Sequence, residues 1–226
     1  MTDKPPENLS LAQAIRRSAI GLGLFAIFTA GIIALTQVLT AERILQNERA
    51  YEARTLFSLV PEHSIDNALL DSAQPTNLPG LVATDLLHLD RPGLWYQGKR
   101  DGQVVAVILP LVAPDGYTEA IRVIMAVNAE GEVLGVRVVS HRETPGLGDQ
   151  IELAKSDWIT TFDQRSLANT AEEAWRVRKD GGVFDAMTGA TITARTLIRS
   201  VQDGLHFFER NRTLLLTPAA VETEES

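Results

Sequence analysis

Residues 94–140, LWYQGKRDGQVVAVILPLVAPDGYTEAIRVIMAVNAEGEVLGVRVVS, carry the strongest secondary-structure signal in this chain. They contain two pairs of segments rich in Val, Ile and Leu, as is typical of half-buried antiparallel strands. A short connection that contains glycine separates the members of each pair and favours a β-hairpin. The pairs are 94–97 with 104–109, joined through Lys99–Gly102, and 120–128 with 133–140, joined through 129–132.

An amphipathic helix is predicted downstream, over residues 191–210, because apolar residues recur there at helical spacing. Two shorter helices are predicted over 151–160 and 171–177. Together with the hairpins they indicate an α+β fold in which antiparallel β-hairpins pack on helices. The apolar face of the long helix comprises Ala194, Leu197, Ile198, Val201, Leu205 and Phe208, and its polar face comprises Arg195, Arg199, Asp203 and His206.

Upstream of the strands, residues 18–41 (SAIGLGLFAIFTAGIIALTQVLTA) contain no charged residue. A helix of about 20 residues crosses a bilayer core, and a helix satisfies its own backbone polar groups there. The run is longer than the roughly 7–15 apolar residues of a cleaved secretory signal, so a retained transmembrane helix is the favoured interpretation. Residues 42–59 are predicted to continue this helix.

The charges around this segment favour a cytoplasmic N-terminus, although Arg residues lie on both sides of it. Turn-forming residues at 71–80 indicate a connector. The predicted organisation is a cytoplasmic tail over 1–17, a transmembrane helix over 18–41, a helical stem and connector over 42–80, a folded domain over 81–210 and an acidic tail over 211–226 that we expect to be disordered.

Composition excludes several classes of function. The 226 residues include no cysteine, which excludes disulfides, thiolate metal sites, iron–sulfur ligation and a cysteine nucleophile. The net charge is −8 and the Lys and Arg residues are scattered, so nucleic-acid binding is not expected. The four histidines lack the paired spacing of metal ligands, and no metal site is expected.

Residues 180–193, DGGVFDAMTGATIT, form a glycine-containing turn crowded with hydroxyls that leads directly into the predicted long helix. The free N–H groups and partial positive charge of a helix N-terminus favour a phosphate there. Gly189 allows close approach of a bulky group, and the hydroxyls of Thr188, Thr191 and Thr193 can bond a phosphate or cap the helix. An ordinary threonine cap is the competing interpretation of this turn.

The sequence Asp185-x-x-Thr188-Gly189-Ala190-Thr191 resembles the D-x-x-[ST]-G-A-T flavinylation motif of the FMN-binding domain family. That family includes the RnfG component of the Rnf/Rsx electron-transport complex and the related flavin-carrying component of the sodium-pumping NADH:quinone oxidoreductase. The resemblance implies that Thr191 carries FMN as a phosphoester, making the chain a phosphoprotein, and that a dedicated flavin transferase takes this FMN from FAD. It also implies that Asp185 assists the modification.

A second segment, residues 141–148 (HRETPGLG), resembles the E-T-P-G-L-G loop of the same family, which lies against the flavin. The resemblance makes Glu143, Thr144, Gly146 and Leu147 candidate flavin contacts, together with Thr188, Gly189 and Ala190. It extends over essentially the whole chain and makes 81–210 the FMN-binding domain. The compact length and the segment Ala-Pro-Asp-Gly-Tyr at 113–117 are more similar to the RnfG component than to its sodium-pump relative.

The resemblance implies an electron-transfer subunit with covalent FMN in an Rnf-type NADH/ferredoxin oxidoreductase, an ion-translocating complex of the inner membrane, with the domain on the periplasmic side. Such a protein acts with other membrane subunits and is not catalytic alone. Three alternatives stay open: a flavin-carrying component of a sodium-pumping NADH:quinone oxidoreductase, a stand-alone membrane-tethered flavoprotein reductase, and a non-redox anchored adaptor whose Thr191 is only a helix cap. The sequence also leaves open whether Lys179 meets the flavin and which tryptophan stacks on it.

Overall fold

The computed structural model describes residues 11–218, which divide into two compact units between Tyr51 and Glu52. In the first unit it describes helix α1, Leu11–Phe57, which continues past this boundary. The stretch Ile15–Ala34 is long and apolar enough, by length and composition, to cross a membrane. The apolar N-terminal helix and its predicted continuation are confirmed as one helix. Most of the predicted cytoplasmic tail and the end of the predicted acidic tail lie outside the described residues.

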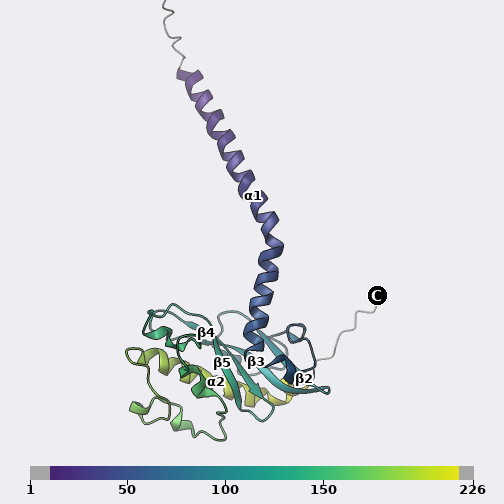
Figure 1. The fold of residues 1–226 in the computed structure, drawn as a ribbon, viewed down its shortest axis with the longest axis vertical. Coiled ribbons are helices and arrows are strands. Elements are labelled where there is room, and N and C mark those ends of the chain that lie inside the picture. Colours follow the sequence, from purple (N-terminus) through teal and green to yellow (C-terminus); the bar gives the residue numbers. More distant parts are fainter. Residues whose placement is uncertain (1–10, 219–226) are drawn as a thin grey trace, which may run out of the picture. The chain divides into compact units, whose positions relative to one another are not determined.

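The second unit is built on an antiparallel sheet of five strands that follow one another in chain order (Figure 1). Both predicted hairpins are confirmed. The first turn is tighter than predicted, because Lys99 and Arg100 still pair with the next strand. Only Asp101 and Gly102 form the turn, with the positive φ angles of 52° and 74° that a two-residue hairpin turn needs. The strands are β1 (Gln74–Pro75), β2 (Leu94–Arg100), β3 (Gln103–Ala113), β4 (Ile121–Asn128) and β5 (Val133–Ser140).

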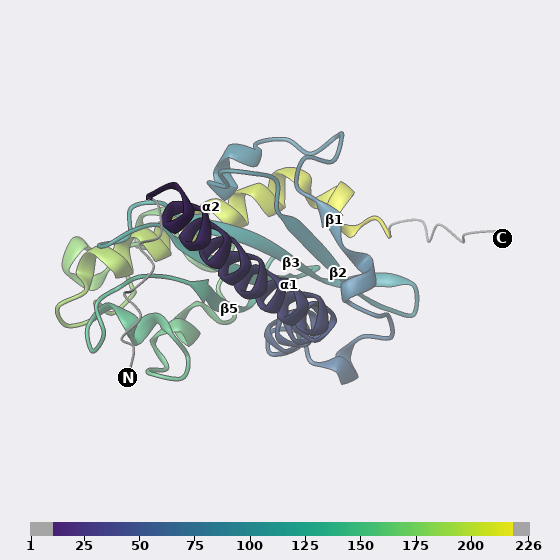
Figure 2. The same cartoon turned by 90° about the horizontal axis from the view of Figure 1, so that it is seen from above.

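The two faces of the sheet bury separate clusters, because successive residues of a strand point to opposite sides. Val107, Leu109 and Leu111 of β3 belong to the larger core, which helix α2 (Thr191–Leu216) covers. Figure 2 shows α2 running along this side of the sheet. The opposite face packs on the residues that end α1 and follow it. That smaller cluster comprises Leu56, Leu59, Val60, Ile65, Leu69, Tyr96, Ala106, Ile108 and Ala126.

Helix α2 buries all six residues of its predicted apolar face, which confirms the amphipathic helix. It ends at Leu216 rather than at residue 210, because Asn211 and Leu215 are buried too. The side-chain oxygen of Asn211 accepts a hydrogen bond from the N–H of Val82 at 2.8 Å, and its amide donates to the carbonyl of Val82 at 2.9 Å. This pair of bonds satisfies a buried polar side chain and fixes the segment before β2 on the helix.

The C-terminal end of α2 is capped from the sheet. Gln97 of β2 is fully buried, and its amide donates to the carbonyls of Leu215 at 2.9 Å and Thr217 at 2.8 Å. Carbonyls at a helix C-terminus have no partner within the helix, so a buried side chain must supply one. The sheet therefore determines where α2 ends.

The two short helices predicted over 151–160 and 171–177 are wrong as α-helices. Residues 141–190 are mainly loops with short 3₁₀ turns. In the first region the hydroxyl of Ser156 accepts from the N–H of Trp158, which competes with helical bonding. In the second, Val177 is extended because it bridges to Phe184. The 3₁₀ turns of the second unit are Glu62–Ser64, Leu70–Ser72, Thr84–Leu87, Gly148–Ile151, Trp158–Phe162, Glu172–Ala174 and Arg178–Asp180.

Replacing Gln97 with Leu should destabilise the fold. The change keeps a similar volume but removes the donor from the carbonyls of Leu215 and Thr217. Leu215 is buried, and leaving its carbonyl unsatisfied costs about 1–3 kcal/mol. Denaturant unfolding of the detergent-solubilised chain measures the difference. Gln103→Leu, at an exposed position of β3, is the control and should change stability by less than about 0.5 kcal/mol. Equal stability of Gln97→Leu and the unaltered chain would contradict the capping role.

Candidate functional site

Thr191 is the first residue of α2, and its hydroxyl does not cap the helix. The N-cap position belongs to Ala190, and no side chain caps that end. The hydroxyl oxygen of Thr191 instead accepts a hydrogen bond from the ammonium group of Lys179 at 3.0 Å. The side chain of Thr191 is half-buried, so this oxygen lies at the protein surface beside a cation. The interpretation of Thr191 as an ordinary helix cap is therefore wrong.

Lys179 is presented by a closed loop at residues 176–185. A parallel bridge joins Val177 to Phe184, and the N–H of Arg178 donates to the carbonyl of Phe184 at 2.8 Å. Gly182 sits against this bridge: a Cβ there would lie 1.9 Å from the carbonyl oxygen of Arg176. Only glycine fits that position. The conformation of the loop is thus determined by backbone contacts rather than by side chains at its tip.

Two ion pairs flank Lys179 in this loop. Asp180 accepts two hydrogen bonds from the guanidinium of Arg195 on α2, at 2.6 and 2.8 Å. Asp185 accepts one from Arg178 at 2.5 Å. The Arg195 hydrogen bond, aided by the positive charges of Arg195 and Lys179, lowers the pKa of Asp180. The second turn of α2 and the loop are thereby joined by a bidentate pair, whose planar geometry restricts their relative orientation.

Glu143 links the E-T-P-G-L-G loop to the start of α2. Its side chain is buried, and one carboxylate oxygen accepts from the hydroxyl of Thr193 at 2.5 Å. The other accepts from the backbone N–H of Thr118 at 3.1 Å. Gly148 packs directly on Glu143, because a Cβ at that glycine would lie 2.6 Å from the nearer carboxylate oxygen. Three segments far apart in sequence therefore meet at one carboxylate.

His141 supports the backbone of the same loop. Its Nδ1 accepts from the N–H of Glu143 at 3.0 Å, and its Nε2 lies 2.8 Å from a carboxylate oxygen of Glu152. Nδ1 is the acceptor in this arrangement, so Nε2 carries the proton that is donated to Glu152. His141 thereby fixes the backbone at Glu143.

A cleft of about 460 Å³ opens between the two motifs. Its volume is in the range of about 300–1,000 Å³ that is usual for small-molecule sites. Glycine backbone contributes to its lining, as do the exposed apolar side chains of Leu147 and Ile192. Gly189 packs on Leu147 with a φ of 78°, a conformation that suits glycine. The lining residues are Tyr117, Glu143, Thr144, Leu147, Gly148, Gly189, Ala190, Thr191, Ile192 and Thr193.

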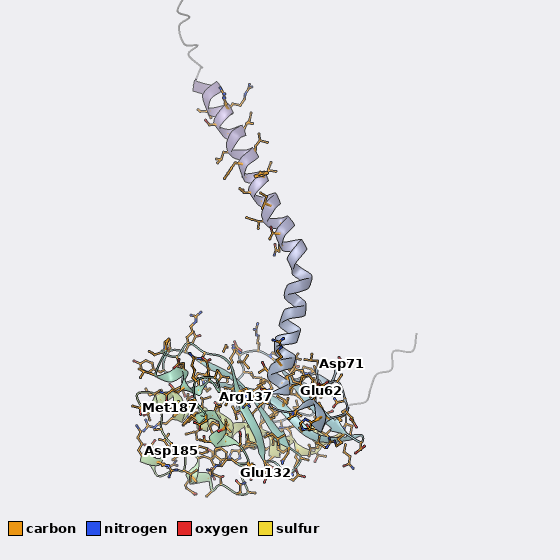
Figure 3. The ribbon with its side chains drawn as sticks, viewed as in Figure 1. Glu62, Asp71, Glu132, Arg137, Asp185 and Met187 are labelled. Carbon is orange, nitrogen blue, oxygen red and sulfur yellow. The ribbon has the colours of Figure 1, made fainter. Side chains whose placement is uncertain are left out.

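The motif loop, residues 180–190, lies away from the start of the second unit. Figure 3 shows Asp185 and Met187 on the side of the unit opposite to Glu62 and Asp71. Met187 is buried and Asp185 is exposed. The loop that leads into α2 at Thr191 therefore passes along the side of the second unit away from the residues that follow α1.

Six of the residues predicted from the sequence line the cleft: Glu143, Thr144, Leu147, Gly189, Ala190 and Thr191. Three others do not line it. Asp185 and Thr188 are exposed, and Gly146 shapes its loop by donating from its N–H to Asp149 at 2.8 Å with a φ of 79°. Three lining residues were not predicted from the sequence: Tyr117, Gly148 and Ile192. Thr193 was predicted only as a hydroxyl that can bond a phosphate or cap the helix. Each of these residues adjoins a motif or a segment already noted, and that proximity was the available signal.

None of the three tryptophans belongs to the lining of this cleft. Trp158 and Trp175 are buried with Phe162 and Phe184 in a group of contacting rings. The indole N–H of Trp158 donates to the carbonyl of Asp185 at 2.7 Å, so it supports the motif loop from inside. Among the side chains that the structure describes, those of His, Asp and Glu form no group of three that could hold a metal ion.

Two protein-family models match this chain, one at its N-terminal helix and one over most of the second unit. Residues 1–59 match the model of the RnfG N-terminal region, and residues 116–206 match that of the FMN-binding domain. Three similar relatives are named as the G-type component of the ion-translocating oxidoreductase complex. The protein from Pseudomonas aeruginosa (strain UCBPP-PA14) is 48% identical, with 91% of this chain and 94% of the relative covered. Those from Vibrio vulnificus (40%; 91% and 95%) and Shewanella loihica (40%; 95% and 99%) are similar over comparable lengths.

Replacing Thr193 with Val should destabilise the second unit by about 1.5–3 kcal/mol, because a buried hydrogen bond to a carboxylate is lost at constant volume. Denaturant unfolding in detergent measures the loss. The exposed neighbour Thr188 provides the control, and Thr188→Val should change stability by less than about 0.5 kcal/mol. A Thr193→Val chain as stable as the unaltered one would show that Glu143 does not depend on this bond.

Proposed function

The chain belongs to the RnfG family of ion-translocating oxidoreductase complexes, and on this basis we propose that it is the FMN-bearing electron-transfer subunit of such a complex. The observation that carries the proposal is the position of the Thr191 hydroxyl. It does not cap the helix, and it lies at the edge of the cleft beside Lys179. The match of residues 116–206 to the FMN-binding domain supports the identity of the cofactor. As one component of a complex, the protein works with other subunits.

The residues of the cleft fit FMN. The phosphate would be carried by Thr191 as a phosphoester, at a helix N-terminus and next to a cation, both of which favour negative charge. Leu147 and Ile192 supply apolar surface for the ring, and Tyr117 lines the same cleft. When bound, FMN passes one or two electrons, while the protein holds it in place and tunes its environment. A covalent bond prevents the cofactor from diffusing away between partners.

We further propose that a flavin transferase loads the site from FAD and that the complex is of the Rnf type, transferring electrons between NADH and ferredoxin. Two observations weaken the alternatives. Ala190, not Thr191, occupies the N-cap, which disfavours a non-redox adaptor. The compared relatives are named as the G-type component of an ion-translocating oxidoreductase complex, which disfavours a component of the sodium-pumping NADH:quinone oxidoreductase. A stand-alone reductase would oxidise a soluble donor without any partner protein.

The apolar part of α1, Ile15–Ala34, supports a membrane location for the chain. We propose that it remains as a single anchor in the inner membrane, with the N-terminal tail in the cytoplasm and the FMN-binding domain in the periplasm. In this arrangement the flavin is on the side opposite to cytoplasmic donors. Electrons must then reach it through membrane partners.

Thr191→Ala should abolish covalent flavin when the chain is produced together with its transferase, because no hydroxyl remains to form the phosphoester. In-gel fluorescence after denaturing electrophoresis and the mass of the peptide that spans Asp185–Arg195 measure attachment. The control is Thr213→Ala, an exposed threonine of the same helix, which should be modified like the unaltered chain. Covalent flavin in Thr191→Ala would disprove this attachment site.

The absence of cysteine allows the proposed topology to be tested with single-cysteine variants. Glu130→Cys, in the exposed turn between β4 and β5, should react with a membrane-impermeant maleimide in intact spheroplasts, because the domain faces outward. Thr2→Cys should react only after the membrane is opened, because the tail faces inward. The reverse pattern of labelling would place the domain in the cytoplasm.

A further inference from the structure

The contact between Lys179 and Thr191 is explained neither by side-chain packing nor by helix capping. Lys179 is exposed, and its ammonium group donates to the hydroxyl oxygen of Thr191 at 3.0 Å. A surface lysine gains little stability from one bond to a neutral hydroxyl, since ordering a long side chain has an entropic cost. The contact is better explained by a chemical role, because the ammonium group of Lys179 donates to the Thr191 oxygen, the atom that must react during flavin attachment.

The position of Lys179 over this atom is fixed from two sides. Its neighbour Asp180 is bonded twice to Arg195, which lies one helical turn after Thr191 on the same face of α2. The closed backbone of the loop, with the N–H of Gly182 donating to the carbonyl of Val177 at 3.2 Å, holds Lys179 and Asp180 at its tip. The ion pair therefore aligns the loop with the helix so that Lys179 faces Thr191.

We propose that Lys179 promotes attachment of FMN to Thr191 by stabilising the charge that develops on the threonine oxygen and on the transferred phosphoryl group. This inference rests on the proposed function. In the step, the O–H bond of Thr191 breaks and its oxygen bonds to the phosphorus of the FMN half of FAD. The pyrophosphate P–O bond breaks, AMP leaves with the bonding electron pair, and the threonine proton passes to water. No oxidation or reduction takes place.

The chemistry suits a lysine at this point. Its ammonium group has three donors, so one can stay on the threonine oxygen while the others reach phosphoryl oxygens. A fixed cation stabilises the transition state of phosphoryl transfer because charge grows on oxygens that it already faces. The nearby Arg178 is bonded to Asp185, which directs its guanidinium elsewhere. After attachment, the same ammonium group neutralises the negative phosphoester.

The test follows attachment in time on the full-length chain. The chain is purified in detergent from cells without the transferase, then incubated with FAD and the transferase, and intact mass gives the modified fraction. Removing one preorganised donor at an oxyanion typically costs about 100-fold or more in rate, so Lys179→Ala should slow attachment by at least about tenfold. Lys179→Arg, which keeps a cationic donor, should recover a substantial part of the rate.

The matched control is Arg176→Ala, which removes a charge from the same exposed loop. Arg176 lowers the pKa of Asp180 through its charge, and within the described chain its side chain makes no hydrogen bond to Thr191. Its attachment rate should stay within about twofold of the unaltered chain, because general positive potential contributes less than a fixed donor. Thermal unfolding should be the same for all variants, since these side chains are exposed.

The outcomes separate the two proposals. If Lys179→Ala is modified as fast as the unaltered chain, or if Arg176→Ala slows attachment equally, the role of Lys179 is overturned while the proposed function stands. If the unaltered chain itself is not modified, the proposed function fails, and the role of Lys179 fails with it. Slow attachment in Lys179→Ala, recovery in Lys179→Arg and an unchanged unfolding temperature together support the proposal.

Discussion

The buried carboxylate of Glu143 is the contact on which the site depends. It accepts from Thr193 at the start of α2 and from the backbone of Thr118 between β3 and β4. A buried carboxylate is costly unless its oxygens are hydrogen-bonded, so these three segments must meet for the fold to be stable. That requirement opens the cleft between the E-T-P-G-L-G loop and the flavinylation motif, and it directs Thr191 to the cleft edge.

Most of the scaffold was predictable because it is encoded locally. The hairpins follow from runs of β-branched residues around short turns, and α2 follows from helical spacing of apolar residues. Its true end was missed because Asn211 looks like a surface residue, whereas the backbone of Val82 satisfies its amide. The short helices were wrong because tertiary contacts, such as the bridge from Val177 to Phe184, replaced helical bonding.

The site was predictable in part, and the limit has a physical cause. Six predicted residues line the cleft because both motifs are contiguous in sequence. Tyr117 was missed because only folding brings its segment to the cleft. The sequence could not decide whether Lys179 meets Thr191, since that contact depends on the distant pair of Asp180 and Arg195. Folding also decides which residue occupies the N-cap of α2, so the sequence alone could not exclude a threonine cap.

The assembly of this cleft from separate segments sets an order of events in the life of the protein. Tyr117, Glu143, Lys179 and Thr191 are distant along the chain and come together only after the sheet and α2 have packed. A newly made chain that is still unfolded presents a bare threonine with no cation beside it. Under the proposed function, loading with FMN would follow translocation and folding, and the covalent bond would mark chains that have completed both. Biogenesis of the complex would then have a checkpoint that needs no separate inspecting factor.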